Sequence, residues 1–201
     1  MSHRNDPAGP ELHRALAAYL FNLTWRLLDR AHRTPSQRDE MVHAAHASRY
    51  HWGRAGRPRN RSIAEWQISR VYAALGRSEP ARHHGRRALA IARRYRLAPF
   101  YVGYALEALA RAAAVGGDRR SRDAYVRRAR ATAARVRAAD DRRRLEADLD
   151  AIVGSTARAS RRTLPRARRA SESAGRRRPV RGQIRGAARR RAGRSPWRGS
   201  L

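Results

Sequence analysis

The stretch that decides the fold is residues 62–76, which read SIAEWQISRVYAALG. Most of its larger apolar residues recur three or four positions apart, as in an amphipathic helix: Ile68, Val71, Tyr72 and Leu75. Ser62 followed by Glu65 has the spacing of a capping box, and Gly76 is the residue type that commonly follows a helix end. The stretch therefore predicts a helix that begins at Ser62 and stops at Gly76.

The spacing after Gly76 repeats further along the chain. Ala88 comes twelve residues after Gly76, and Ala129 comes twelve residues after Gly117. In each pair we expect the glycine in a turn between two helices and the alanine where those helices pack closely. A small residue suits both places, because the turn is tight and the backbones approach each other. The repeated spacing predicts two helical hairpins of the same kind.

The rest of the first 153 residues reads as further helices, with no convincing strand. Seven helical segments are predicted, at about residues 11–30, 34–52, 62–75, 80–95, 99–115, 118–136 and 140–152. Thr34 and Gln37 form a second capping box around Pro35, and Asp118 can cap the sixth segment. Short connections between ordinary helices favour antiparallel neighbours. The predicted fold class is all-α, built from antiparallel helical hairpins, after a disordered N-terminal segment at residues 1–10.

The composition is strongly basic. The 201 residues include 47 Lys+Arg against 16 Asp+Glu, a formal net charge of +31, and every one of those cations is arginine. Cysteine is absent, which excludes disulfides and thiolate chemistry. Residues 155–201 hold 16 arginines and one acid, Glu172, with too few large apolar residues to form a core. We predict a helical domain at residues 11–153 and a disordered arginine-rich tail at residues 154–201.

The paired helices resemble the tetratricopeptide repeat. That family has an aromatic residue, a Leu-Gly pair and a later small residue at matching offsets, as this chain has at Tyr72, Leu75, Gly76 and Ala88. The second unit keeps Gly117 and Ala129 but has Ala113 at the aromatic place, and its glycine follows the first by 41 residues instead of the family's 34. The resemblance implies hairpins stacked as a right-handed superhelix with a concave face.

Three strings of sequence are also similar to an uncharacterised bacterial family of tetratricopeptide-repeat-like proteins: residues 43–48, 50–52 and 65–77. This resemblance implies the same architecture and no particular activity. The stacked hairpins favour a protein–protein interaction module, a scaffold or adaptor that holds a peptide or protein partner in its concave groove. An acidic partner is expected, because arginines would line that groove.

Two other functions stay open at this point. The arginine-rich surface and tail suit the phosphate backbone of nucleic acid, although coding bias in a GC-rich gene would also enrich arginine. A small metalloprotein is the other: His43 and His46 share a helical face, and Asp39 lies one turn before His43. The competing interpretation of these histidines is hydrogen bonding across a helix pair.

Several conspicuous residues are assigned to the core or to a groove. Trp52 and Trp66 are expected in the core, with His51 packed near Trp52. His83 and His84 are expected on a solvent-exposed face.

Glu65 has two possible roles in the sequence. It is either the capping partner of Ser62 or a buried partner of an arginine such as Arg70 or Arg61. Capping is the preferred interpretation, because it needs no long-range contact.

The sequence has no nucleophile elbow, phosphate loop or dinucleotide fingerprint, so we expect neither an enzyme nor a cofactor. No apolar stretch is long enough for a membrane helix, and the N-terminus has no secretory pattern. A cytoplasmic protein without membrane insertion is expected, and the oligomeric state is left open.

Overall fold

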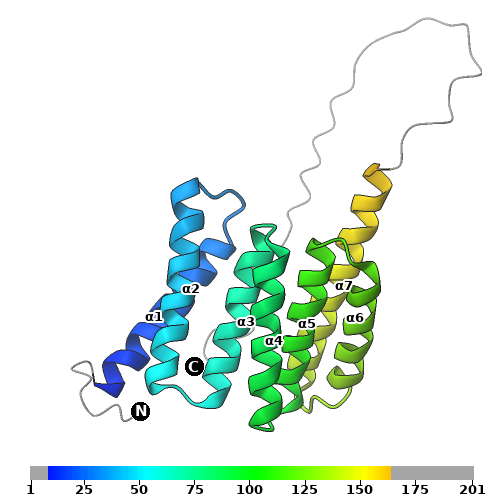
Figure 1. Cartoon of the computed structure of the whole chain (residues 1–201). Coiled ribbons are helices and arrows are strands. Elements are labelled where there is room, and N and C mark those ends of the chain that lie inside the picture. The colour runs from blue at the N-terminus through cyan, green and yellow to red at the C-terminus, as the bar shows by residue number, and fades with distance from the viewer. Residues whose placement is uncertain (1–8, 164–201) are drawn as a thin grey trace, which may run out of the picture.

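The computed structural model describes residues 9–163 of the chain, with side chains as far as Gly154. These residues form seven helices and no strand, which confirms the all-α prediction. The helices are α1 (Pro10–Leu28), α2 (Pro35–Ala55), α3 (Pro58–Ala74), α4 (Ser78–Arg94), α5 (Pro99–Val115), α6 (Arg119–Ala133) and α7 (Ala139–Thr163). Figure 1 shows them in chain order, from α1 and α2 at one end to α6 and α7 at the other.

Helices α3 and α4 form the predicted antiparallel hairpin. Two buried serines of α3 fix the register by donating to backbone carbonyl groups of α4. Ser62 Oγ donates to the Ala88 oxygen at 3.1 Å, and Ser69 Oγ donates to the Ala81 oxygen at 2.6 Å. A step of seven residues forward in α3 is thus a step of seven residues back in α4. The small serine and alanine side chains allow this close approach.

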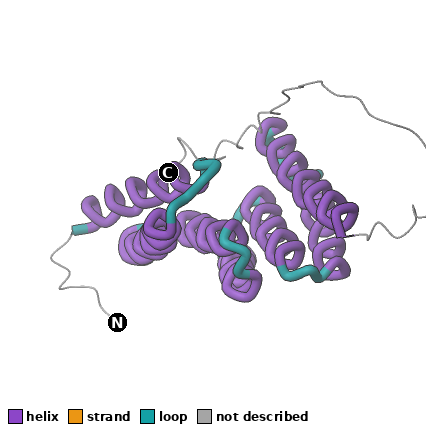
Figure 2. Tube along the Cα trace, turned by 90° about the horizontal axis from the view of Figure 1, so that it is seen from above, coloured by secondary structure: helices purple, strands orange, loops and turns teal. Residues whose placement is uncertain are grey.

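The helices are arranged in two layers. The odd-numbered helices form one layer, since α3 contacts both α1 and α5, and α5 contacts α7. Among the described residues, the backbones of the even-numbered helices approach those of the odd-numbered helices and not each other. Figure 2, a view from above, shows several helices nearly end-on and packed side by side. The odd layer is therefore the tighter one, and spaces between successive even helices have an odd helix as their floor.

The main hydrophobic core lies along the odd-numbered helices. Its largest fully buried side chains come from α1, α3, α5 and α7: Phe21, Trp25, Trp66, Tyr104, Leu109, Leu145 and Leu149. Ala88 of α4 and Ala129 of α6 complete it, and both are wholly buried. In the described residues no helix is both long enough and apolar enough to cross a membrane.

Three successive turns end their helices with the same backbone motif. One residue in each turn adopts left-handed backbone angles: Gly76 at φ +75°, Arg96 at φ +48° and Gly117 at φ +75°. The following amide then donates to a carbonyl five residues earlier, from Arg77 to Tyr72, Leu97 to Ala92 and Asp118 to Ala113, each at 2.9 Å. This pattern is the Schellman motif, which favours glycine at the left-handed position. Of these three turns, only the one between α4 and α5 has a residue other than glycine, Arg96, at the left-handed position.

We expect Arg96→Gly to raise the free energy of unfolding by about 1 kcal/mol, because it removes the cost of a left-handed non-glycine residue. Gly76→Ala is expected to lower it by about the same amount. Urea denaturation of the two variants and the wild type measures both values. If both substitutions lowered stability, the left-handed conformation at Arg96 would be refuted.

The two largest departures of the helix boundaries from the sequence predictions are at the start of α3 and the end of α7. Helix α3 begins at Pro58, with Arg57 before it, so the predicted start at Ser62 is wrong. Helix α7 continues to Thr163, past the predicted domain end at residue 153. The rest of the predicted tail, residues 164–201, and residues 1–8 lie outside the described residues.

Other helix starts agree with the sequence. The capping box of Thr34 and Gln37 is present, with both of its hydrogen bonds. Asp118 caps α6 by accepting from the backbone N–H of Ser121 at 2.9 Å.

Candidate functional site

Two buried carboxylates organise the polar interior of the helix stack. Glu65 of α3 is 1% exposed and Glu107 of α5 is 0% exposed. Each is surrounded by cationic or hydrogen-bonding side chains from neighbouring helices. We call these groups the Glu65 cluster and the Glu107 cluster.

The Glu65 cluster joins α2, α3 and α4. Arg49 of α2 donates from Nε to Glu65 Oε1 at 2.8 Å, and Arg87 of α4 donates from Nε to the same oxygen at 2.9 Å. His84 of α4 lies with Nδ1 2.7 Å from Glu65 Oε2. Because the carboxylate is an acceptor, His84 Nδ1 carries the proton in this contact. One buried anion therefore links both neighbouring even helices to α3.

Burial alone would raise the pKa of Glu65. The hydrogen bond from His84 and the charges of Arg49 and Arg87 outweigh burial and lower the pKa to about 2 from an ordinary value of 4.5. Glu65 is thus ionised at neutral pH and fully engaged with cations. It is not arranged as a general acid or base, which would need a pKa near the working pH.

The preferred prediction for Glu65, capping of Ser62, is wrong. Helix α3 begins four residues before Ser62, whose hydroxyl is used in the contact with α4. The other interpretation, a buried partner of arginine, is the one observed, but with Arg49 and Arg87 in place of Arg70 or Arg61. Contacts across helices prevailed over the local motif.

His46 and Tyr72 lie beside the Glu65 cluster. His46 Nε2 is 3.0 Å from the Tyr72 hydroxyl, which links α2 to α3. The ring of His84 stacks on Tyr72 at 5.8 Å and meets the ring of His46 edge-on at 5.3 Å. Burial, and then the nearby His84, lower the pKa of His46. The prediction that His84 lies on a solvent-exposed face is wrong, since its side chain is 14% exposed.

The candidate metal ligands are not brought together. Asp39 and His43 are exposed on α2, and His46 faces Tyr72. In residues 9–154 no group of three or more His, Cys, Asp or Glu side chains is arranged to hold a metal ion. Hydrogen bonding across a helix pair, the competing interpretation, is what His46 does.

His51 of α2 contacts a histidine of α1, within the α1–α2 helix pair. Its Nδ1 lies 2.7 Å from Nδ1 of His13, a buried residue of α1. Tyr50 packs edge-on against the His51 ring at 5.3 Å. Trp52, which follows, is 4% exposed in a small core between α1, α2 and α3.

The Glu107 cluster joins α3, α5 and α7. Trp66 donates from its indole Nε1 to Glu107 Oε2 at 2.9 Å, which places this tryptophan in the core. Arg111 donates from Nε to Glu107 Oε1 at 2.8 Å, and its Nη2 lies 3.9 Å from Asp148 of α7. Arg70 Nη1 lies 3.8 Å from Glu107 Oε1. The cluster is balanced in formal charge, with two arginines and two carboxylates.

Burial and neighbouring charges together set the pKa values of this cluster. Burial lowers the pKa of Arg70, with a further contribution from nearby Arg111. Burial and the charge of Glu107 raise the pKa of Asp148, although Arg70 and Arg111 oppose them. For Arg111 the two carboxylates outweigh burial and raise the pKa. Burial also raises the pKa of Tyr104, whose ring packs on Trp66.

Arg70 is the member of the Glu107 cluster with unused bonding capacity. Its guanidinium lies over the ring of Trp25, 5.5 Å from the ring centroid. Among the described residues its Nη1 has no hydrogen-bond acceptor, although this atom is buried. The side chain as a whole is 21% exposed. Buried donors are nearly always satisfied, so this nitrogen needs an explanation.

The Glu107 cluster was not predicted from the sequence. A usable signal was present, because Glu107 is the only charged residue in the apolar run from residue 98 to 110. A lone acid on an apolar helix is almost always paired when buried. Arg70 and Arg111 are also 41 residues apart, the same spacing as Gly76 and Gly117, and so occupy equivalent places in successive hairpins.

The repeat residues lie at structural positions. Gly76 and Gly117 lie in turns, Ala88 and Ala129 in the core, and Tyr72 and Leu75 at the α2–α3 contact. A scan against protein-family models finds no match to this chain, and neither the curated proteins nor the solved structures contain one.

Proposed function

We propose that the protein is a helical-repeat interaction module that binds a peptide or protein segment across its odd-numbered helices. The observation that carries this proposal is Arg70, whose side chain is 21% exposed although its guanidinium is held between Trp25 and Glu107. A bound segment with a carboxylate or carbonyl oxygen pairs with the exposed part of this side chain. The charge-assisted bond to a carboxylate is the stronger of the two, which favours an acidic segment.

The surroundings of Arg70 support this role. Trp25 holds the guanidinium plane from α1, and Glu107 orients it from α5. Arg111 occupies the equivalent place one hairpin later, but its Nε and Nη2 are already engaged by Glu107. Two arginines at equivalent places thus differ in what they have left to offer a partner. The tetratricopeptide resemblance of residues 62–138 fits a module of this kind.

A peptide-display selection against the full chain tests the proposal. We expect acidic peptides to be selected, and their affinity to fall about tenfold in Arg70→Gln, which corresponds to one charge-assisted hydrogen bond. Arg93→Gln is the matched control, because it removes the same charge from an exposed site on α4. Selected peptides that bind both variants equally well would refute the role of Arg70. Thermal unfolding of each variant checks that the fold is retained.

A further inference from the structure

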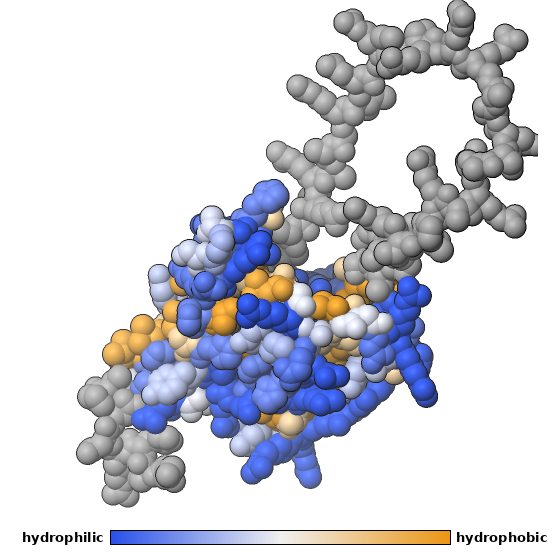
Figure 3. Space-filling model, turned by 45° about the horizontal axis from the view of Figure 1, so that its top comes forward, coloured by the Kyte–Doolittle hydropathy of each residue, from blue (hydrophilic) through white to orange (hydrophobic). Residues whose placement is uncertain are grey.

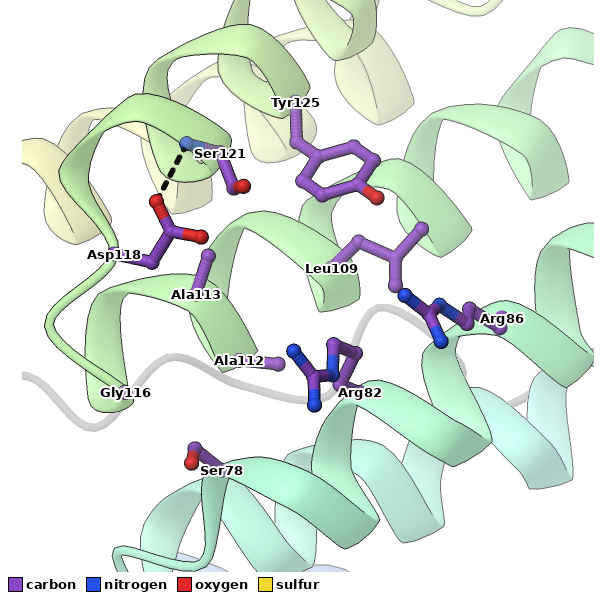
Figure 4. A pocket seen from close by; sticks show the side chains of 10 residues that line it. All are labelled: Ser78, Arg82, Arg86, Leu109, Ala112, Ala113, Gly116, Asp118, Ser121 and Tyr125. Carbon is purple, nitrogen blue, oxygen red and sulfur yellow. Dashed lines mark hydrogen bonds between the residues drawn. The ribbon is translucent and has the colours of Figure 1, made fainter.

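A pocket opens between α4 and α6. The Glu107 cluster lies on the other side of the odd-numbered layer, where α3, α5 and α7 meet. The pocket has a volume of about 150 Å³, and α5 forms its floor with Leu109, Ala112 and Ala113. Figure 4 shows the guanidinium groups of Arg82 and Arg86 on the α4 side, and Ser121 and Tyr125 on the α6 side. The pocket thus combines a small apolar floor with polar walls. We call it the α4–α6 groove.

The cations of this groove lack the counter-charge that the neighbouring groove has. Between α2 and α4, Glu65 rises from the floor helix and forms ion pairs with Arg49 and Arg87. The position 41 residues after Glu65 is Leu106, so the floor of the α4–α6 groove carries no equivalent acid. Among the described residues, no carboxylate forms an ion pair with Arg82 or Arg86.

One carboxylate does line the groove. Asp118 accepts from the backbone N–H of Ser121 and so caps α6. Hydrogen bonds from Ser121, and secondarily the charge of Arg82, lower the pKa of Asp118. This single acid is committed to the helix start and leaves an excess of positive charge beside the groove.

The helices that flank the groove extend this excess well beyond it. Helix α4 carries five arginines and one acid, Glu79, and α6 carries six arginines and one acid, Asp123. Figure 3 shows hydrophilic side chains over much of the visible face, with smaller hydrophobic areas between them. An anion with one charge would use only the groove. A chain with repeated negative charges matches both flanking helices as well.

We propose that the α4–α6 groove binds the phosphate backbone of single-stranded nucleic acid. Arg82 and Arg86 lie one helical turn apart on α4, and guanidinium groups are well suited to phosphate oxygens. Tyr125 supplies an aromatic ring on the opposite wall, and such rings stack on bases in grooves of this type. The floor side chains Leu109, Ala112 and Ala113 carry no acceptor for the guanidinium groups. This inference does not depend on the proposed binding of a peptide at Arg70.

Fluorescence anisotropy with a labelled oligouridylate and the full chain tests the groove. In Arg82→Gln/Arg86→Gln we expect affinity to fall tenfold or more, and the slope of log affinity against log salt to become shallower by about 1.4, the value for two lost contacts to a single strand. The matched control is Arg14→Gln/Arg38→Gln, which removes two exposed arginines from α1 and α2. That control is expected to change affinity less than threefold, because long-range charge effects are screened. The tail is present in all variants, so its contribution cancels.

Tyr125 provides a second readout. Tyr125→Leu is expected to weaken binding about tenfold, whereas Tyr125→Phe keeps the ring and is expected to bind like the wild type. Equal losses in the groove variant and the α1–α2 control would overturn the proposal, as would an absence of binding by the wild-type chain. It would also be overturned if a phosphoserine peptide displaced the oligouridylate at lower concentration than unlabelled oligouridylate does. None of these outcomes bears on peptide binding at Arg70.

Discussion

Replacing Trp66 with alanine is expected to lower the free energy of unfolding by about 4 kcal/mol, the typical cost of removing a fully buried tryptophan. Trp66 is 2% exposed and links three odd-numbered helices. Its ring lies 5.7 Å from that of Trp25 on α1 and 5.4 Å from that of Tyr104 on α5. Its indole nitrogen also donates to the buried carboxylate of Glu107. The substitution therefore opens a cavity and removes a donor from a buried charge.

Trp66→Phe separates these two effects. The smaller ring retains much of the contact with Trp25 and Tyr104 but leaves Glu107 without the indole donor, so we expect a loss of about 2 kcal/mol. Denaturant titration of the three proteins gives the values. A cost below about 1 kcal/mol for Trp66→Ala would mean that α1, α3 and α5 do not share one core.

Replacing Glu65 with glutamine is expected to lower the free energy of unfolding at neutral pH by about 3 kcal/mol. Removing one member of a buried charge cluster leaves the others without compensation. Here Arg49 and His84 are mostly buried, whereas Arg87 is 50% exposed and can turn to solvent, which keeps the cost at the lower end. The control is Glu79→Gln on the exposed surface of α4, where we expect a change below about 0.5 kcal/mol.

The pH dependence of stability gives an independent test of Glu65. Its pKa is lower in the folded protein, at about 2, than its ordinary 4.5, so its stabilising effect is present above pH 4.5 and disappears as the pH falls towards 2. That difference in pKa corresponds to about 3 kcal/mol. The gap in stability between the wild type and Glu65→Gln should therefore close over this range. A gap that stayed constant from pH 7 to pH 2 would contradict the ionised cluster.

The helices themselves could be predicted because their signals are local. The capping box at Thr34 and the glycines at Gly76 and Gly117 depend on residues a few positions away, and the structure has the corresponding caps and turns. The turn at Arg96 has the same backbone geometry, but it could not be predicted from the sequence because no glycine occupies the left-handed position. Helix α3 also starts before its apparent cap, because Pro58 at the first turn fits a helix start as well as a loop.

The polar clusters could not be predicted in the same way. Glu65 is held by Arg49, sixteen residues earlier, and by Arg87, twenty-two residues later. The spacing of neighbouring residues does not identify partners this far along the chain. It favoured a capping role for Glu65 that the structure does not show. The arginines show the same limit: composition records their number, whereas only the packing of helices decides that Arg87 is paired and Arg86 is left with no partner among the described residues.

Successive helices form antiparallel hairpins, and the two layers of these hairpins separate the Arg70 site from the α4–α6 groove. Distances between spin labels test this arrangement most directly, because the chain has no cysteine and introduced ones are unique labelling sites. With labels on exposed positions, the pair Arg59→Cys/Arg93→Cys is predicted to be closer than Arg59→Cys/Glu79→Cys by about 10 Å, since α4 runs back along α3 at 1.5 Å per residue and packed helices lie about 8–10 Å apart. Equal distances, or a shorter second distance, would contradict the hairpin and both surfaces built on it.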